Sequence, residues 1–302
     1  MRLTSSPDSN QNDRRQSRRG PQRSLIAGVE SRLCVGLAIL WTAAAVTFAQ
    51  TPAAPQPGTP PVRSQFHEPS PMDFNDHTGF TQIFDGQSLA DWEGDPAFWR
   101  VENGAIVGES SKDNVVYNAY IWRKDLVAKD FDLKLEIKCE IAGGSGIQYR
   151  SQTGLPWTKP LHPGEKRNLD WLMTGPQADF WFPVNPLHAS YSGQFYSENT
   201  PLGIVAWRGE VVNSAAGAGP RLVGAIGDRS ALGGYVKIND WNQYEIIARG
   251  GTMIHILNGQ LMAVLIDDDP ASSNNLAGKI GIELEGTPAK VSVRNIWIRK
   301  LN

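Results

Sequence analysis

Residues 131–141 read FDLKLEIKCEI, and this stretch decides the fold. Every odd position from Phe131 to Ile141 is apolar or a cysteine, and every even position is charged. A period of two residues is typical of a β-strand with one face in a core and the other in water. The charges therefore predict a solvated sheet face, and Cys139 is expected to point inward as a buried, unreactive thiol.

Asn-Gly pairs between apolar runs extend the β pattern along the chain. Asn103-Gly104 and Asn258-Gly259 each fit a two-residue hairpin, because a type I′ turn needs positive φ at both central positions. No long segment has a helical period. Further strands are expected at Gly146–Ser151, Tyr244–Ala248, Ile280–Leu284 and Val291–Leu301. The predicted fold is all-β: a jelly-roll sandwich of two antiparallel sheets.

The first quarter of the chain reads as a targeting segment and a tether. Residues 1–49 hold a basic stretch, an apolar run at Leu33–Val46 and a small-residue cleavage site, which is the order of a signal peptide. The alternative, an uncleaved membrane anchor, needs ~20 apolar residues. Residues 50–72 are rich in proline and predict a linker. We expect residues 73–302 to form one domain, exported to the periplasm or the cell exterior, with no stable membrane span after cleavage.

Charge and cysteine content exclude two classes of protein. Residues 50–302 carry 22 basic and 28 acidic side chains, which argues against a nucleic-acid-binding surface. Cys139 is the one cysteine in that part of the chain, so neither an internal disulfide nor a four-cysteine zinc site can form.

The strand pattern is interrupted between Ser151 and Gly203. This segment is rich in Trp, Pro, Gly, His and Asn, with short strand signals only. Long loops in compact domains are usually functional or disordered, and Trp157, Trp171 and Trp181 argue against disorder. We expect a long loop folded over a site.

Polar residues spaced two apart on the expected strands are the candidates for that site. The pairs are Gln148 and Arg150, Gln177 and Asp179, and Tyr196 and Glu198. Such spacing aims both members at one face of a sheet. If the three faces converge, they form a sugar site, with polar groups for hydroxyls and aromatic rings for the apolar sugar faces. The alternative is that each pair lies on an exposed face and is solvated by water.

A few other residues admit two interpretations. Trp207 and Arg208 could add a stacking ring and a second guanidinium to the site, or form a half-buried tryptophan beside an ion pair. His255 shares a strand face with Met253, which favours a packed, hydrogen-bonded histidine. The Asp267-Asp268-Asp269 run favours a solvated turn over a structural calcium site. No motif in the sequence identifies a cofactor. The sequence does not decide whether the site binds a metal, and a divalent ion is one option.

Several short motifs, in order, resemble one family. They are Phe84-Asp85-Gly86, Leu89 and Trp92; Trp99-Arg100-Val101-Glu102-Asn103-Gly104; Gly144-Ser145-Gly146-Ile147-Gln148-Tyr149-Arg150-Ser151; Gln177-Ala178-Asp179; Gly193-Gln194-Phe195-Tyr196-Ser197-Glu198; Trp241-Asn242-Gln243-Tyr244; His255-Ile256-Leu257-Asn258-Gly259; and Val291-Ser292-Val293-Arg294-Asn295-Ile296. Together they resemble the 3-keto-disaccharide hydrolase domain family from about Gly79 to Leu301. The resemblance implies a concanavalin A-like jelly roll that acts on 3-keto-glycosides.

The chain departs from the family pattern at two places. Glu283-Leu284-Glu285 stands where the family often has Gln-x-His, so that Glu285 replaces a histidine that could bind metal or substrate. Gly144 stands where the family usually has an asparagine.

Action on a 3-keto-glycoside implies particular chemistry. The ketone acidifies the proton on C2, so that a base can remove it and expel the substituent on C1, after which water adds. Asp179 or Glu198 is expected to be the base and Arg150 the clamp on the enolate, while the other carboxylate or His255 donates a proton. The remaining candidates, Gln148, Gln177, Tyr196, Trp207 and Arg208, would bind the substrate. Carboxylates within about 10 Å of each other across a cleft would fit this reading.

Three other functions stay open at this stage. Two carboxylates could displace the glycosidic bond directly, without any ketone. The same face could belong to a non-catalytic carbohydrate-binding module of the cell envelope. A structural envelope protein without a ligand is the third, and it applies if the three polar pairs do not converge.

Overall fold

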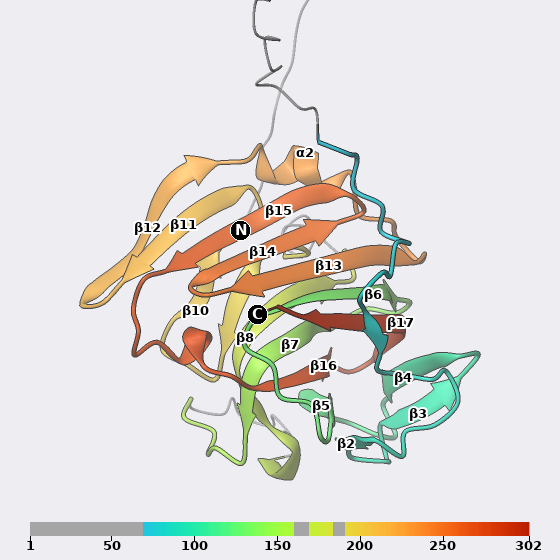
Figure 1. The fold of residues 1–302 in the computed structure, drawn as a ribbon. Coiled ribbons are helices and arrows are strands. Elements are labelled where there is room, and N and C mark those ends of the chain that lie inside the picture. Colours follow the sequence, from blue (N-terminus) through green and yellow to red (C-terminus); the bar gives the residue numbers. More distant parts are fainter. Residues whose placement is uncertain (1–68, 160–168, 184–190, 302) are drawn as a thin grey trace, which may run out of the picture. The chain divides into compact units, whose positions relative to one another are not determined.

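The computed structural model describes residues 69–159, 169–183 and 191–301, and it confirms the all-β prediction (Figure 1). These residues belong to the unit Glu68–Asn302. The signal peptide predicted at 1–49 and nearly all of the linker predicted at 50–72 lie outside the described residues, so both stay predictions. Among the described residues, no helix is long and apolar enough to cross a membrane.

The larger sheet has ten strands. In spatial order they are β12 (Ala218–Ala225), β11 (Glu210–Ala215), β15 (Gln260–Asp267), β14 (Thr252–Leu257), β13 (Asn242–Arg249), β6 (Phe131–Cys139), β17 (Ala289–Lys300), β4 (Ala105–Ser110) and β3 (Trp99–Glu102), with β1 (Thr81–Gln82) paired to β17. All neighbours are antiparallel except β11 and β15, which run parallel.

The smaller sheet has seven strands and is antiparallel throughout. In spatial order they are β10 (Gly203–Ala206), β9 (Phe195–Glu198), β8 (Met173–Trp181), β7 (Gly144–Thr153), β16 (Lys279–Glu285), β5 (Asn118–Arg123) and β2 (Trp92–Gly94). The described helices are short: α2 (Arg229–Gly233) and 3₁₀ turns at Leu169–Trp171 and Ser273–Asn275.

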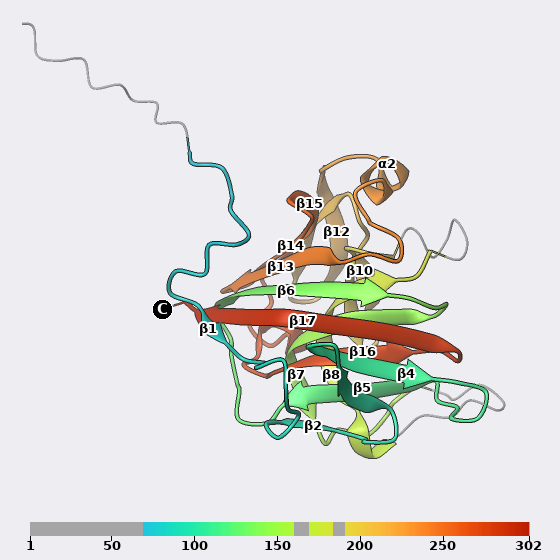
Figure 2. The same ribbon diagram turned by 90° about the vertical axis from the view of Figure 1, so that its right-hand side faces the viewer.

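The core lies between the two sheets, which Figure 2 shows edge-on. Odd residues of β6 such as Leu133 and Ile137 are fully buried, as the alternation predicted. From the smaller sheet, residues such as Ile147 and Ile282 belong to the same apolar cluster. Cys139 is buried with them, and burial raises the pKa of its thiol, as expected for an unreactive cysteine.

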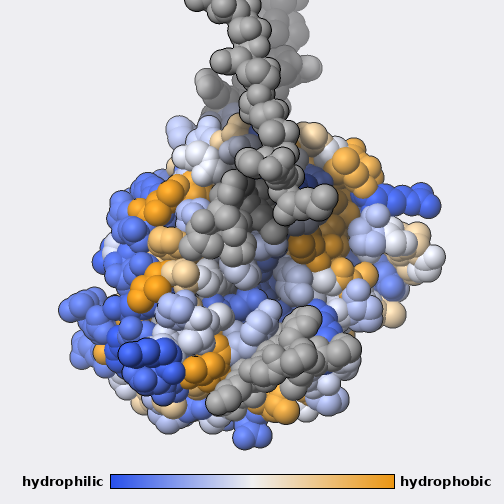
Figure 3. All heavy atoms as spheres, turned by 180° about the vertical axis from the view of Figure 1, so that it is seen from behind, coloured by the Kyte–Doolittle hydropathy of each residue, from blue (hydrophilic) through white to orange (hydrophobic). Residues whose placement is uncertain are grey.

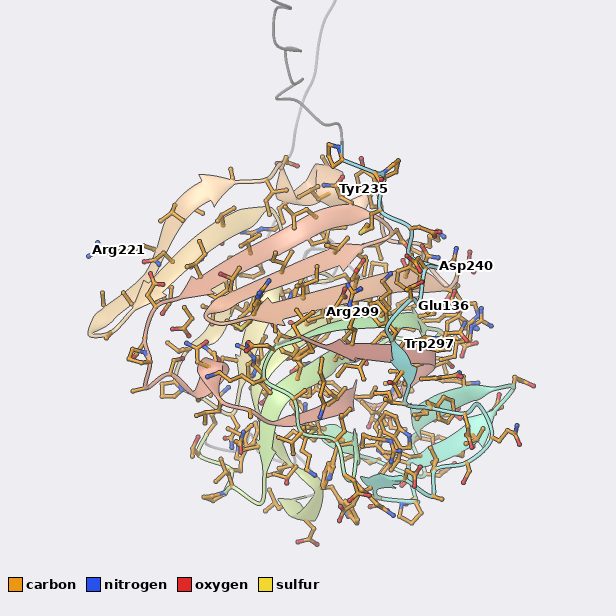
Figure 4. The ribbon with its side chains drawn as sticks, in the orientation of Figure 1. Glu136, Arg221, Tyr235, Asp240, Trp297 and Arg299 are labelled. Atoms are coloured by element: carbon orange, nitrogen blue, oxygen red, sulfur yellow. The ribbon has the colours of Figure 1, made fainter. Side chains whose placement is uncertain are left out.

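The charged face of β6 is not simply solvated, and this corrects one prediction. Lys134 is buried because residues 73–80, here called the strap, lie across it. Its ammonium donates hydrogen bonds to the carbonyls of Asp73 and Asp76 and lies 4.9 Å from the centre of the Phe80 ring. Two residues of β17, Trp297 and Arg299, also hold the strap; both are labelled in Figure 4. Trp297 stacks on His77 with 4.3 Å between ring centres, and the Arg299 guanidinium lies 4.6 Å from the centre of the Phe80 ring.

Both Asn-Gly hairpins form as predicted. Asn103 and Gly104 have φ of 51° and 76°, and Asn258 and Gly259 have φ of 50° and 78°. Positive φ at both central positions is the type I′ geometry.

The expectation of one long loop between Ser151 and Gly203 is wrong. The segment contains β8, a nine-residue strand between β7 and β9, as well as β9 itself. Gly175 and Pro176 stand inside β8 and obscure its pattern, because both residue types are depleted in strands. Gly175 has a φ of 139°, and the register of β8 with β7 shifts between Gln148 and Gln152.

Candidate active site

A cavity of about 620 Å³ lies on the face of the smaller sheet that points away from the core. Figure 3 views the molecule from behind Figure 1, where hydrophilic residues lie in the middle of the face and apolar residues border them. The described lining combines four carboxyl groups, amides and a lysine with aromatic rings: Tyr117, Asn118, Trp157, Lys159, Gln177, Asp179, Trp181, Tyr191, Gln194, Tyr196, Glu198, Ile204, Glu283 and Glu285.

The alternation of side chains along β8, β9 and β16 directs these polar and aromatic groups into the cavity. On β8, Gln177, Asp179 and Trp181 face the cavity while Ala178 and Phe180 face the core. Tyr196 and Glu198 on β9, and Glu283 and Glu285 on β16, follow the same rule. The sequence prediction that the Gln177/Asp179 and Tyr196/Glu198 pairs converge is therefore confirmed.

Glycines of β7 form the floor between the carboxylates. Gly146 is in register with Asp179 of β8 on one side and Glu283 of β16 on the other. Adjacent strands lie ~4.8 Å apart, so the Asp179 and Glu283 backbones are about 10 Å apart across the glycine. A Cβ on Gly146 would meet Gln177 Nε2 at 2.1 Å, so a larger residue here would fill the floor.

Glu283 is the centre of a buried hydrogen-bond network. Its carboxylate accepts hydrogen bonds from Asn118 and Gln177, and from the Tyr120 hydroxyl at 2.8 Å. Gln177 in turn accepts from Gln148 Nε2 at 2.7 Å. Hydrogen bonds from neutral donors stabilise a charged carboxylate, so this network supports a fixed negative charge at the cavity floor.

Asp179 is buried as Glu283 is, but its hydrogen bond from Gln194 does not offset the effect of burial. It is 4% exposed, and burial raises the pKa of its carboxyl well above the usual range. Gln194 Nε2 donates to Asp179 Oδ2 at 2.5 Å and opposes this shift, while the charges of Glu283 and Glu198 add to it. Asp179 is therefore held toward its protonated form beside the hydrogen-bonded carboxylate of Glu283.

Lys159 brings a positive charge to the cavity. Its ammonium donates to Tyr196 Oη at 3.0 Å and lies 5.1 Å from the centre of that ring and 5.8 Å from the Trp157 ring. These contacts orient the lysine against the aromatic wall while its head group still lines the cavity.

A ladder of rings continues from the wall of the cavity. Tyr191 meets Trp181 edge-on at 5.1 Å and stacks on Trp207 at 5.9 Å. Arg229 covers the far side of Trp207 at 4.0 Å. Trp207, predicted to bind substrate, therefore supports Tyr191 from behind and does not line the cavity.

Arg150, predicted to clamp the enolate, points elsewhere. Its backbone has a φ of 52° within the register shift of β7, which turns the side chain away from the face that Gln148 occupies. The fully buried guanidinium donates to the carbonyls of Lys129 and Asn274 and pairs with Asp130 at 3.1 Å. Its contacts are structural, and the prediction that Gln148 and Arg150 share one face is wrong.

Two further predicted site residues, Gln148 and Arg208, lie beneath the cavity or outside it. Gln148 is buried below Gln177. Arg208 is also buried, and its guanidinium donates hydrogen bonds to the backbone carbonyls of Ser192 and Arg229. These contacts are within the protein, so Arg208 has a structural role.

His255 lies on β14, in the core between the sheets, and is packed and hydrogen-bonded as its strand pattern suggested. Burial lowers the pKa of its imidazole to about 4, so the ring is neutral at physiological pH. Nδ1 lies 3.2 Å from the Gln194 carbonyl and Nε2 lies 2.8 Å from Tyr149 Oη. A carbonyl only accepts, so Nδ1 carries the proton and Nε2 accepts from the tyrosine.

Sequence reasoning missed some of the strongest groups. Glu283 and Glu285 occupy alternate positions of a predicted strand, so the same two-residue spacing that selected Asp179 could have selected them. Asn118 and Gln194 gave a weaker signal, because each is a single amide whose direction depends on strand pairing. Lys159 follows a strand in an irregular segment, where no periodicity applies.

Among the described residues, no group of three or more His, Cys, Asp or Glu side chains is arranged to hold a metal ion. Asp267 is the buried last residue of β15 and accepts hydrogen bonds from Ser272 Oγ and Asn274 Nδ2, whereas Asp268 is exposed. The predicted solvated turn therefore describes only part of the acidic run.

The structure is a β-sandwich with an acidic, aromatic-walled cavity on the outer face of one sheet. Residues 79–299 match the family described as the 3-keto-alpha-glucoside-1,2-lyase-like domain, and the chain belongs to this family of carbohydrate-acting proteins. The family expected from the motifs is thus confirmed. No curated protein sequence matches the chain.

Several solved structures are similar to this chain at low sequence identity. A provisionally named glycosyl hydrolase from Parabacteroides distasonis is 19% identical, with a TM-score of 0.44, covering 74% of this chain and 95% of that one. The carbohydrate-binding module CBM66 from Bacillus subtilis is 12% identical, with a TM-score of 0.41 and coverages of 70% and 96%. A galectin-like protein from the same organism is 12% identical, with a TM-score of 0.46 and coverages of 73% and 94%. With such low sequence identities and TM-scores, these similarities carry no information about the function of this chain.

Proposed function

We propose that the chain is an enzyme that cleaves the glycosidic bond of 3-keto-glycosides by elimination in this cavity. The observation that carries the proposal is the contrast between Asp179, which burial holds toward its protonated form, and two carboxylates beside it that accept hydrogen bonds. Glu198 accepts from the Asn199 amide at 3.0 Å, and Glu283 accepts from the Tyr120 hydroxyl at 2.8 Å. An elimination needs a proton donor and a base within one site, and carboxyl groups with different environments supply both.

In this mechanism Glu198 removes the proton from C2, and the electron pair of the broken C–H bond passes into the C3 carbonyl to form an enolate. The ammonium of Lys159 stabilises the negative oxygen, the role first expected of Arg150. The enolate then expels the C1 oxygen, which takes the proton of Asp179. An enone and the free aglycone leave the site, and addition of water to the enone completes a net hydrolysis.

Deuterium labelling separates this proposal from direct displacement. The purified protein is incubated with methyl 3-keto-α-glucoside in D₂O, and methanol release, enone absorbance and deuterium at C2 of the sugar are followed. Elimination gives an enone without hydrogen on C2, and the addition of D₂O to this enone then places deuterium at C2 of the hydrolysed 3-keto sugar. Methanol release without deuterium at C2 would indicate displacement by two carboxylates, and no methanol release at all would refute the enzyme.

A second candidate function is sugar binding without cleavage, and the aromatic wall of Trp157, Trp181 and Tyr191 favours it. Flat rings bind the apolar faces of sugars whether or not chemistry follows. Calorimetric binding of the same glycoside, with no product after long incubation, would support this function.

Export also belongs to the proposal. We expect cleavage after residue 49, with the mature domain in the periplasm or outside the cell. N-terminal sequencing of the protein recovered from cell fractions tests this, and a cytoplasmic product that begins at Met1 would contradict it.

A further inference from the structure

Gln194 holds one polar atom that the fold does not use. The side chain is 2% exposed and lines the cavity. Its Nε2 donates to Asp179 Oδ2 at 2.5 Å, whereas its Oε1 is buried and has no hydrogen-bond partner. Buried polar atoms are nearly always paired in native proteins, so an unpaired acceptor in a cavity calls for an explanation.

The backbone of Gln194 is fixed from several sides, so this arrangement is built in. Its carbonyl accepts from the Asp179 amide at 3.3 Å and from His255 Nδ1 at 3.2 Å. The His255 ring also stacks on the neighbouring Phe195, with 5.6 Å between ring centres. This explains why a neutral histidine lies beneath the cavity without reaching it.

Asp179 orients the amide. Nε2 donates to Asp179 Oδ2, and this oxygen accepts the bond whether the carboxyl is ionised or carries its proton on Oδ1. With Nε2 committed to Asp179, Oε1 is left as a pure acceptor at the wall of the cavity. Its partner must be a donor, and the donors that a neutral sugar carries are hydroxyl groups.

We propose that Gln194 Oε1 accepts a hydrogen bond from the C2 hydroxyl of the keto sugar and makes that hydroxyl a condition of efficient turnover. This inference rests on the proposed function, in which Asp179 protonates the oxygen on C1. Nε2 and Oε1 belong to one planar amide, and Nε2 is bonded to Asp179. A sugar hydroxyl that binds Oε1 must therefore lie close to the C1 oxygen that Asp179 protonates. The hydroxyl adjacent to C1 is the one on C2.

The proposal defines a substrate class. Sugars with a free C2 hydroxyl satisfy Oε1, whereas 2-deoxy and 2-O-methyl sugars leave it buried and unpaired. A site built around a substrate hydroxyl rejects analogues that lack it, because its own polar group then stays unsatisfied. The 2-deoxy analogue keeps the acidic C2 protons, so the elimination itself stays available to it.

The test compares kcat/KM of the wild type and Gln194→Met on methyl 3-keto-α-glucoside and on its 2-deoxy analogue. Methionine keeps the length of the side chain but removes both polar atoms. The loss of the Asp179 contact slows both substrates alike, so the readout is the ratio between them. We expect the preference for the hydroxylated sugar to fall by about 10- to 100-fold in Gln194→Met. Gln243→Met, on the outer face of β13, is the matched control and should keep the wild-type ratio.

Different results separate the two proposals. An unchanged ratio in Gln194→Met, with the wild type active, overturns the role of Gln194 and leaves the enzyme intact. Inactivity of the wild type on both sugars refutes the proposed function instead. Gln194 is then tested by calorimetric binding of methyl glucoside and its 2-deoxy form, where an equal loss of affinity for both in Gln194→Met overturns the inference. Gln194→Asn replaces Gln194→Met in both assays if thermal unfolding shows that the methionine variant is not folded.

Discussion

The indole of Trp181 occupies the space that a side chain at Gly144 would need. A Cβ built on Gly144 would lie 2.5 Å from Trp181 Cε2, and the two residues are in register on β7 and β8. Gly144 is a position where the family resemblance leads one to expect asparagine. Because Gly144 has no side chain, the Trp181 indole can lie over it and form part of the aromatic wall of the cavity.

Replacing this glycine should disturb the wall. Gly144→Asn is expected to displace Trp181, raise KM about tenfold and lower the melting temperature, because overpacking a filled position is destabilising. Gly144→Asn combined with Trp181→Gly should recover the melting temperature but not KM. Gly219→Ala is the control, since a Cβ there has open space around it. A single variant with normal KM would show that the ring is not part of the binding wall.

The two carboxyl groups proposed for proton transfer can be removed separately. Asp179→Asn and Glu198→Gln should each lower kcat/KM by about 10²- to 10⁴-fold, the usual contribution of a general acid or base. Circular dichroism and thermal unfolding verify that both variants fold. Asp240→Asn, an exposed aspartate outside the cavity, should have wild-type kinetics. Full activity in both cavity variants would refute the assignment.

The charge of Glu283 should be visible in the pH–rate profile. Burial raises the pKa of Asp179 first, and Glu283 adds to the increase, so a neutral residue at 283 should lower it. Asp179 acts as the acid, hence activity is lost as pH rises through its pKa. Glu283→Gln should therefore shift the basic limb of kcat to lower pH, whereas Glu102→Gln on the β3 hairpin should leave it in place. A basic limb that stays put, or moves upward, in Glu283→Gln would count against this electrostatic role.

Arg150 should matter for stability rather than for catalysis. Arg150→Met leaves two carbonyls and Asp130 without their donor, and the expected loss is roughly 2–4 kcal/mol in the free energy of unfolding, measured by urea titration. KM measured well below the melting temperature should not change. Arg249→Met, at an exposed position, is the control. A large rise in KM with normal stability would return Arg150 to the substrate site.

The outer face of the larger sheet predicts a pH-dependent stability. Burial, together with the neighbouring Asp132, raises the pKa of Glu245 from 4.5 to about 7, while Lys134 and Arg299 oppose the shift. The folded state thus binds this proton more tightly than the unfolded state, and stability falls as pH rises between these values, by roughly 1–3 kcal/mol.

Glu245→Gln keeps the uncharged shape of the side chain. It should match the wild type near pH 4 and exceed it in free energy of unfolding at pH 8. Glu93→Gln, an exposed carboxylate on β2, should follow the wild-type curve at every pH. Parallel curves for the wild type and Glu245→Gln would remove Glu245 as the source of the dependence.

How far the sequence could predict this site depended on how regular each strand is. On β8 and β9 the two-residue spacing held, and it correctly brought Asp179 and Glu198 to one cavity. On β7 the same rule failed one residue past Tyr149, because Arg150 adopts positive φ and a shifted register reverses the faces. Alternation describes a regular strand, and an irregularity of this kind leaves no mark in the pattern of apolar and polar residues.

The remaining differences arise from tertiary contacts. The charges of β6 predicted an open face, but the strap that buries Lys134 comes from residues some sixty positions earlier. The role of Glu283 likewise depends on donors brought to it by strand pairing. Periodicity along one strand contains no information about which strand becomes its neighbour.

The position of β16 between β5 and β7 has a consequence for folding. Glu283 reaches Asn118 and Tyr120 across 165 and 163 residues of chain, so the floor of the cavity cannot close before β16 has been synthesised. Pairing between such distant segments is slow compared with the formation of local hairpins. The cavity is therefore expected to form later than the two Asn-Gly hairpins, whose strands are neighbours in the sequence.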